Sequence, residues 1–75
     1  MRVTFDNVLV CDVRKTTFED KTYYSLVVYQ DGKLYRISIP QDAVNTFKEV
    51  VGQSFSLEAN MSTYDGKVKF KLIQD

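Results

Sequence analysis

A chain of 75 residues has room for one domain, because a second hydrophobic core could not form in so few residues. Hydrophobic residues make up 44% of the chain and charged residues 27%, which excludes a disordered protein, and no apolar run approaches the roughly 18 residues of a membrane span. Ten basic side chains balance ten acidic ones, so attraction to nucleic acid would have to come from where the cations lie. We therefore treat residues 1–75 as a single domain.

The N-terminal sequence and the cysteine content indicate a compartment. The first ten residues, MRVTFDNVLV, alternate in character and lack the long apolar stretch and cleavage site of a secretory signal. Cys11 is the one cysteine and cannot form an internal disulfide, so a cytoplasmic location is expected. Cys11 itself is expected to be a small buried apolar residue.

The first predicted strand covers residues 2–15 and bends near its start. Its apolar side chains alternate in one phase before Asp6 and in the opposite phase after Asn7. One extra residue in a strand reverses the side-chain phase, so a bulge is predicted at these two positions. The following KTTFEDKT, residues 15–22, is predicted to be a polar connection with Phe18 in its middle.

The segment TYYSLVVYQDGKLYRIS, residues 22–38, predicts two strands joined by a tight turn. Asp31 and Gly32 suit this turn, because both of its central residues need a positive φ. The turn fixes the register, with Gln30 opposite Lys33, and alternation then separates two faces. The core face comprises Tyr24, Leu26, Val28, Tyr35, Ile37 and Ile39, and the second face comprises Tyr23, Ser25, Val27, Tyr29, Leu34, Arg36 and Ser38.

Residues 40–52, PQDAVNTFKEVVG, change from the strand period to helical spacing. Pro40 suits the start of a helix and Gly52 suits its C-terminal cap, which limits the helix to about three turns. The apolar stripe that would plug the core comprises Val44, Phe47 and Val51.

Strict alternation returns in residues 54–61 and 67–73, which are predicted to be the last two strands. The link STYDG, residues 62–66, has Tyr64 at its tip and an Asp-Gly turn. The side chains predicted to point inward are Phe55, Leu57, Ala59 and Met61 in the first of these strands and Val68, Phe70 and Leu72 in the second.

Three strands, a short helix and two further strands are the element order of the OB-fold, a five-stranded and partly open Greek-key barrel. The predicted fold class is therefore all-β with one short helix, in a five-stranded OB-fold-like barrel whose first strand bends to join both sheets. A small SH3-like barrel, which usually lacks a helix of this length at this place, and an α+β sheet with one packed helix are the alternatives.

The fold places a candidate binding surface on the second face. In OB-folds, oligonucleotides lie across strands two and three, between the loops that join strands one to two and four to five. Each of these places has an aromatic side chain with a cation nearby. Aromatic rings stack on bases for about 1–3 kcal/mol per base while cations follow the phosphates, so the combination is typical of single-stranded nucleic-acid binding. Lys69 and Lys71 are expected to continue this surface beyond Arg36. The predicted nucleic-acid-binding residues are Lys15, Phe18, Lys21, Tyr23, Tyr29, Lys33, Arg36, Tyr64, Lys67 and Lys69.

Acidic residues are predicted to concentrate away from this surface, at Asp42, Glu49 and Glu58. The exceptions in the proposed binding loops are Glu19, Asp20 and Asp65. These exceptions argue for a modest affinity or for a position of these loops at the edge of the binding surface.

The segment DKTYYSLVVYQDGKLYRISI, residues 20–39, in a chain of this size resembles the small helix-destabilising, single-stranded-DNA-binding proteins of phages and conjugative elements. The resemblance implies a barrel decorated with tyrosine and phenylalanine, often dimeric, whose usual basic loop is diluted here by acidic residues. It implies base stacking or phosphate contact for Phe18, Tyr23, Tyr29, Arg36 and Tyr64.

Catalysis is not expected, because the chain has no histidine, a single cysteine and no glycine-rich phosphate loop; no cofactor, metal or membrane is expected either. The main alternative function is a protein–protein interaction or assembly module that uses the same aromatic face, including a homodimer through an exposed strand face. The same side chains also have purely structural explanations. The tyrosines would then form ordinary cross-strand pairs, Phe18 would cover a barrel end, and the lysines of the last strand would block edge pairing.

Overall fold

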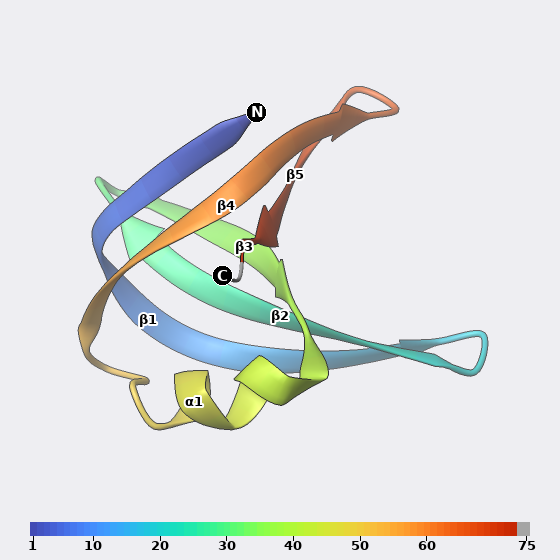
Figure 1. Cartoon of the computed structure of the whole chain (residues 1–75), viewed down its shortest axis with the longest axis horizontal. Coiled ribbons are helices and arrows are strands. Elements are labelled where there is room, and N and C mark those ends of the chain that lie inside the picture. Colours follow the sequence, from blue (N-terminus) through green and yellow to red (C-terminus); the bar gives the residue numbers. More distant parts are fainter. Residues whose placement is uncertain (74–75) are drawn as a thin grey trace.

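Five strands close into a barrel around one apolar core in the computed structural model, which describes residues 1–73 (Figure 1). Strands account for 70% of the structure, and one short helical segment of 8 residues separates the third and fourth strands. The elements are β1 (Arg2–Phe18), β2 (Lys21–Gln30), β3 (Lys33–Ile39), the 3-10 turn η1 (Gln41–Ala43), α1 (Val44–Lys48), β4 (Ser54–Tyr64) and β5 (Lys67–Leu72).

The strand order around the barrel is β1-β2-β3-β5-β4, with β1 and β4 adjacent. The pairing of β3 with β5 is parallel and the other pairings are antiparallel. This order and the position of the helical segment confirm the predicted five-stranded OB-fold-like barrel.

The strand β1 pairs with β4 over its first half and with β2 over its second. Its register against β4 shifts between Phe5 and Val8, and Asn7 has a φ of 51°, so the predicted bulge is confirmed. A second shift, between Val10 and Asp12, was not predicted. It leaves Cys11 without a partner on β2 and exposed, so the prediction of a buried cysteine is wrong.

The hairpin of β2 and β3 has the predicted register, with Gln30 opposite Lys33 and Tyr24 opposite Ile39. Asp31 and Gly32 both have a positive φ, at 51° and 82°, as a two-residue hairpin turn requires. The core face and the second face are also confirmed, since the fully buried side chains of this hairpin all belong to the predicted core face. These are Leu26, Val28 and Ile37.

The helical segment closes one end of the barrel, opposite the β4–β5 hairpin (Figure 1). Its buried side chains are Ala43, Val44 and Phe47, and the ring of Phe47 lies edge-on to Phe55 at 5.7 Å. At the core, Phe5, Tyr35 and Phe70 meet edge to face with ring centroids 5.2–5.9 Å apart.

The helix is shorter than predicted, and Val51 is exposed instead of plugging the core. The backbone beyond Lys48 turns to bond β1: Gly52 N donates to Val10 O at 2.7 Å, and Val10 N donates to Gln53 O at 2.9 Å. These bonds connect the segment to β1, and the helical stripe stops before Val51.

Residues 15–22 form a β-hairpin and not the predicted polar loop. β1 and β2 stay paired out to Phe18 and Lys21, so the turn consists of Glu19 and Asp20 alone, with φ values of 49° and 67°. Thr16 and Thr17 before the turn and Thr22 after it favour extended backbone, which explains the continued pairing. We call this projecting ribbon, residues 14–23, the first arm.

A second arm, residues 62–69, is the far end of the β4–β5 hairpin, with its turn at Asp65 and Gly66. Val68 was predicted to point into the core but is exposed, because it pairs with Thr63 in the ribbon beyond the barrel, where no core lies beneath it. Both arms leave the barrel on the same side, at the right of Figure 1.

The burial pattern predicts how core and surface leucines contribute to stability. Leu26→Ala should lower the free energy of unfolding by about 2–5 kcal/mol, because it removes a fully buried side chain. Leu34→Ala, at a position 67% exposed on the neighbouring strand, should change it by less than about 0.5 kcal/mol. Urea denaturation followed by circular dichroism measures both.

If Leu26→Ala does not fold, Ile37→Val provides the same test with an expected loss of about 0.5–1.5 kcal/mol. Equal losses for a buried and an exposed substitution would contradict this assignment of the core.

Candidate nucleic-acid interface

The outward side chains of β2 and β3 are arranged in rows that cross neighbouring strands. Directly opposed residues of paired strands point to the same side of the sheet, so the register defines each row. One row runs from Leu9 through Tyr29 to Leu34, and the next from Asp12 through Val27 to Arg36. A third row runs through Arg14, Ser25, Ser38 and Lys71, from β1 to β5. We call these three rows, with Tyr23, the outer face.

Two tyrosines of β2 stand on the outer face with their rings accessible. Tyr23 is 51% exposed and Tyr29 is 44% exposed. They are six residues apart on one strand, which corresponds to about 20 Å. One nucleotide cannot contact both rings, so a ligand that uses both must be a strand of several nucleotides.

The middle of the outer face has a cationic depression. Arg14, Val27, Leu34, Tyr35 and Arg36 line a shallow groove of about 290 Å³. Arg36 was predicted for the site, whereas Arg14 was not. The signal that would have found Arg14 is the hairpin register of β1 against β2, which places it opposite Ser25. Arg14 forms an exposed ion pair with Asp12, Nε to Oδ2 at 3.5 Å, and such a pair is weak enough to exchange for another anion.

The first arm presents Phe18 and a lysine together at its tip. Phe18 is 63% exposed and lies directly opposite Lys21, so both point to the same side of the ribbon as Tyr23. The alternative that Phe18 covers a barrel end does not fit this exposure. Lys15 lies opposite Tyr24 and therefore points to the other side of the arm.

The second arm presents Tyr64 with lysines on the same side. Tyr64 is 70% exposed and opposite Lys67, and Lys69 Nζ lies 5.4 Å from the centroid of its ring, a cation–π contact. Lys71 follows on this side of β5, beside Ser38 of β3. Lys33, next to the β2–β3 turn, alternates with Leu34 and points away from this surface.

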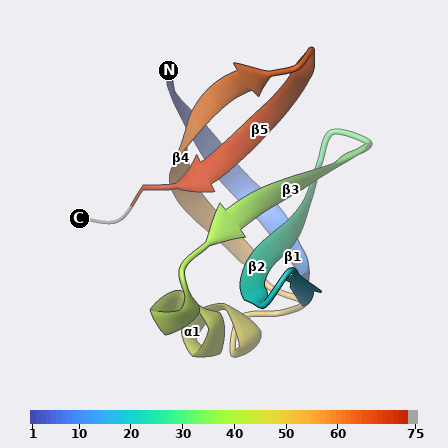
Figure 2. The same cartoon turned by 90° about the vertical axis from the view of Figure 1, so that its right-hand side faces the viewer.

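Figure 2 looks onto the side from which the arms project, with β3 and β5 in front. Of the ten residues predicted for binding, eight lie on the outer face or on the matching side of an arm, and the two that the structure does not bring there are Lys15 and Lys33. The prediction that Lys69 and Lys71 continue the Arg36 side agrees with the parallel β3–β5 register.

The acidic side chains near this surface have a conformational reason for their position. Asp20, Asp31 and Asp65 occupy hairpin turns with φ values of 67°, 51° and 55°, a conformation that aspartate tolerates better than most residues. On the β1–β4 side of the barrel, Glu58 is paired with Arg2, Oε2 to Nε at 3.3 Å. Phosphate near the outer face would therefore meet acids at the hairpin turns and at Asp12, which is paired with Arg14.

Two other kinds of site were sought in residues 1–73. No helix there is long and apolar enough to cross a membrane. No group of three or more His, Cys, Asp or Glu side chains in the same residues gathers where it could hold a metal ion.

Comparison with models of known families, with curated proteins and with solved structures gave no match to this chain.

The arms should exchange their backbone amide hydrogens faster than the barrel does. Residues 14–18 and 62–64 lie in two-stranded ribbons with few buried apolar contacts, and such ribbons open at low free-energy cost. Hydrogen exchange followed by NMR on dilute protein should show rapid exchange there and slow exchange in residues 26–28. Equal protection of arms and barrel would mean that another chain covers the arms.

Proposed function

We propose that this protein binds single-stranded nucleic acid, with DNA as the expected form, across the outer face and between the two arms. The observation that supports this most directly is the set of exposed aromatic rings, each with a cation on the same side of its ribbon or in the next row. The rings are those of Phe18, Tyr23, Tyr29 and Tyr64. Lys21 lies on the same side as Phe18 and Tyr23, Arg36 lies in the row next to Tyr29, and Lys67 and Lys69 lie beside Tyr64.

Stacking supplies the part of the affinity that does not depend on salt. Each ring that stacks on a base contributes about 1–3 kcal/mol, with little dependence on which base it is. Bases in a duplex are already stacked on each other and unavailable to side chains, so rings of this kind select single strands. The separation of Tyr23 and Tyr29 by about 20 Å fits a bound stretch of several nucleotides.

The cations supply the part that does depend on salt. Five lysine and arginine side chains on this side make no ion pair with other described residues. They are Lys21, Arg36, Lys67, Lys69 and Lys71. Net charge is zero for the whole chain, so the local excess on this side is what attracts phosphate.

A protein–protein interface on the same face is the second candidate, and one observation favours it. The row of Leu9, Tyr29 and Leu34 is apolar across three strands, and Leu34 is 67% exposed. Interface centres are more apolar than the rest of a protein surface and are enriched in aromatic side chains, whereas a leucine side chain cannot bind phosphate.

The first test is an NMR titration with oligo-dT at low salt. Amide shifts should be largest in residues 14–41 and 62–72, and the logarithm of the affinity should fall linearly with the logarithm of salt, with a slope of about −2 to −3.5. A matched duplex should bind much more weakly. No shift of these amides with any single-stranded oligomer at low salt would contradict the proposal.

Single substitutions separate stacking from folding. Tyr29→Ala and Phe18→Ala should each weaken oligo-dT binding by about 5- to 100-fold, because each removes one stacking ring. Tyr29→Phe keeps the ring and should bind within about 3-fold of the unmodified protein, and Val51→Ala, an exposed change at the helical end, should bind normally.

Light scattering on the same variants tests the second candidate. If the face is a subunit interface, Tyr29→Ala should lower the oligomer mass and leave oligonucleotide binding per chain unchanged.

A further inference from the structure

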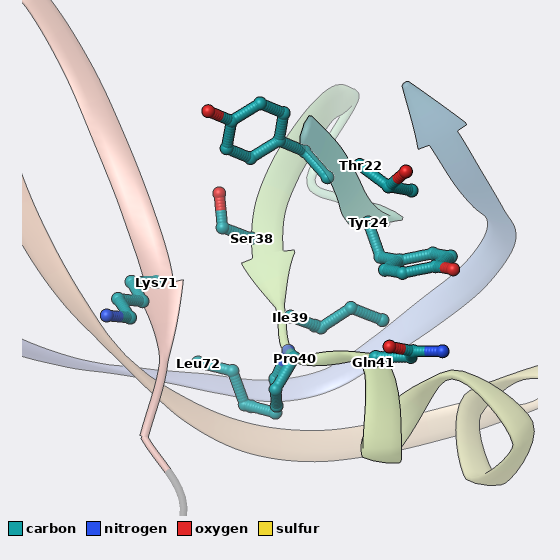
Figure 3. A pocket seen from close by; sticks show the side chains of 9 residues that line it. Thr22, Tyr24, Ser38, Ile39, Pro40, Gln41, Lys71 and Leu72 are labelled. Atoms are coloured by element: carbon teal, nitrogen blue, oxygen red, sulfur yellow. The ribbon is translucent and has the colours of Figure 1, made fainter. Parts of the chain in front are cut away.

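A groove of about 460 Å³ lies where β2, β3 and β5 meet the helical segment (Figure 3). This volume is within the range of about 300–1,000 Å³ that small-molecule sites occupy. Its lining includes side chains from β2, from the end of β3, from η1 and from the end of β5. Those used below are Tyr23, Tyr24, Ser38, Ile39, Gln41 and Lys71.

The groove exists because β3 ends opposite Tyr24, so that the first residues of β2 extend beyond the end of β3. Tyr24 is the first residue of β2 that pairs with β3, and its partner Ile39 is followed by Pro40, which has no N–H and turns the chain into η1. Residues 21–23 of β2 consequently pair with β1 on one side, and no described strand pairs with them on the other. The uncovered edge of β2 thus presents unpaired backbone donors and acceptors beside the groove.

The groove combines an apolar floor with a polar rim. Ile39 is buried and Tyr24 is half-buried, and in Figure 3 the Tyr24 ring lies above the Gln41 amide with Ile39 beside both. Ser38 and Gln41 are exposed at the rim, and neither makes a side-chain hydrogen bond to another of residues 1–73. They are free to bond a ligand.

A cation and an aromatic ring mark the mouth of the groove. Lys71 is next to Ser38 across the β3–β5 pair, and its ammonium points away from Ser38 in Figure 3. Its four-carbon stem is flexible, so the ammonium can follow a phosphate at the mouth. Tyr23 both lines the groove and stands on the outer face. A strand crossing the outer face would therefore pass the mouth.

We propose that this groove takes one nucleobase of the bound strand, with the adjoining phosphate at Lys71; the inference rests on the proposed function. A planar base needs an apolar surface beneath it and two or three hydrogen bonds at its edge. The Gln41 amide offers both a donor and an acceptor, the pair of groups that a base edge can bond. The consequence is a base preference at one position of a strand that is otherwise bound without regard to sequence.

Addition of a peptide strand to the β2 edge is the competing occupant. The uncovered edge is residues 21–23 alone, whereas strands in proteins average about 5–6 residues. So short an edge gives a peptide few ladder bonds, which is why the geometry favours a base.

Mononucleotides test the groove apart from the extended face. Each of the four deoxynucleoside 5′-monophosphates at millimolar concentration should shift the amides of residues 22–24, 38, 39, 41, 71 and 72, to an extent that depends on the base. Inorganic phosphate and deoxyribose 5-phosphate should shift residues 71 and 72 at most, beside Lys71, and leave the other groove amides unchanged. Equal shifts with phosphate alone, or none with any mononucleotide, would overturn the proposal.

Homopolymers then test the preference in an intact complex. The unmodified protein should discriminate among oligo-dA, oligo-dC and oligo-dT by about 5-fold or more. Gln41→Ala and Ser38→Ala should reduce that ratio towards unity, and Lys71→Gln should weaken all three equally. Val51→Ala, outside the groove, should leave the ratio unchanged.

The two proposals fail in different ways. The proposal for the groove is contradicted if all homopolymers bind with no preference, or if a preference remains in both Gln41→Ala and Ser38→Ala. Either result leaves the proposed function intact. Absence of binding to any oligomer overturns both. Groove amides that shift with protein concentration and not with mononucleotides overturn the groove in favour of strand addition.

Discussion

A barrel of five strands closes here because β1 changes partner partway along its length. Its first half bonds β4 and its second half bonds β2, and the direction change between them requires the left-handed backbone at Asn7 and the unpaired residue at Cys11. Two features of the surface follow. The second half of β1 runs on with β2 past the barrel, which forms the first arm. The far side of the barrel is left to β3 and β5, which meet at only two registered pairs of residues, so their ends and the β2 edge surround a groove.

The size of the barrel explains why so many aromatic rings face outward. A single core is formed by the inward side chains, and the alternation that buries Leu26 and Val28 must expose Tyr23 and Tyr29 on the same strand. No second layer covers them within residues 1–73. Exposed tyrosine in a strand is ordinary for β-propensity. The rings here stand along one strand and again at the tips of both arms, on the outward side of each ribbon, and no packing requirement within residues 1–73 accounts for the rings at the arm tips.

The sequence predicts faces and turns well wherever local chemistry decides them. Asp31 and Gly32 determine the β2–β3 register, and the phase change at Asn7 reveals the first bulge. The turn at Glu19 lacks glycine, so the first arm, and with it the alignment of Arg14, could not be recognised. Periodicity also predicts on which side of a ribbon a side chain lies, but not whether a core packs against that side. Val68 was wrongly predicted to be in the core for this reason. The side on which each residue of the candidate site lies follows from strand alternation. The groove instead depends on where β3 ends relative to β2 and β5, which only the tertiary structure shows.

Charge placement decides how such a surface would act on a strand. Aspartates are required at the turns for their backbone conformation, so the arm tips carry negative charge whatever the ligand. Lys21 and Lys67 lie beside the turns at the two tips, whereas Arg36, Lys69 and Lys71, which make no ion pair with another described residue, lie along β3 and β5. On the proposed function, a phosphate backbone meets a lysine together with carboxylates at each tip and cations alone on the outward side of β3 and β5, so the attraction is greatest over these two strands. The groove also opens there, so on these proposals the same electrostatic attraction would bring the bound strand to the groove that we propose to distinguish bases.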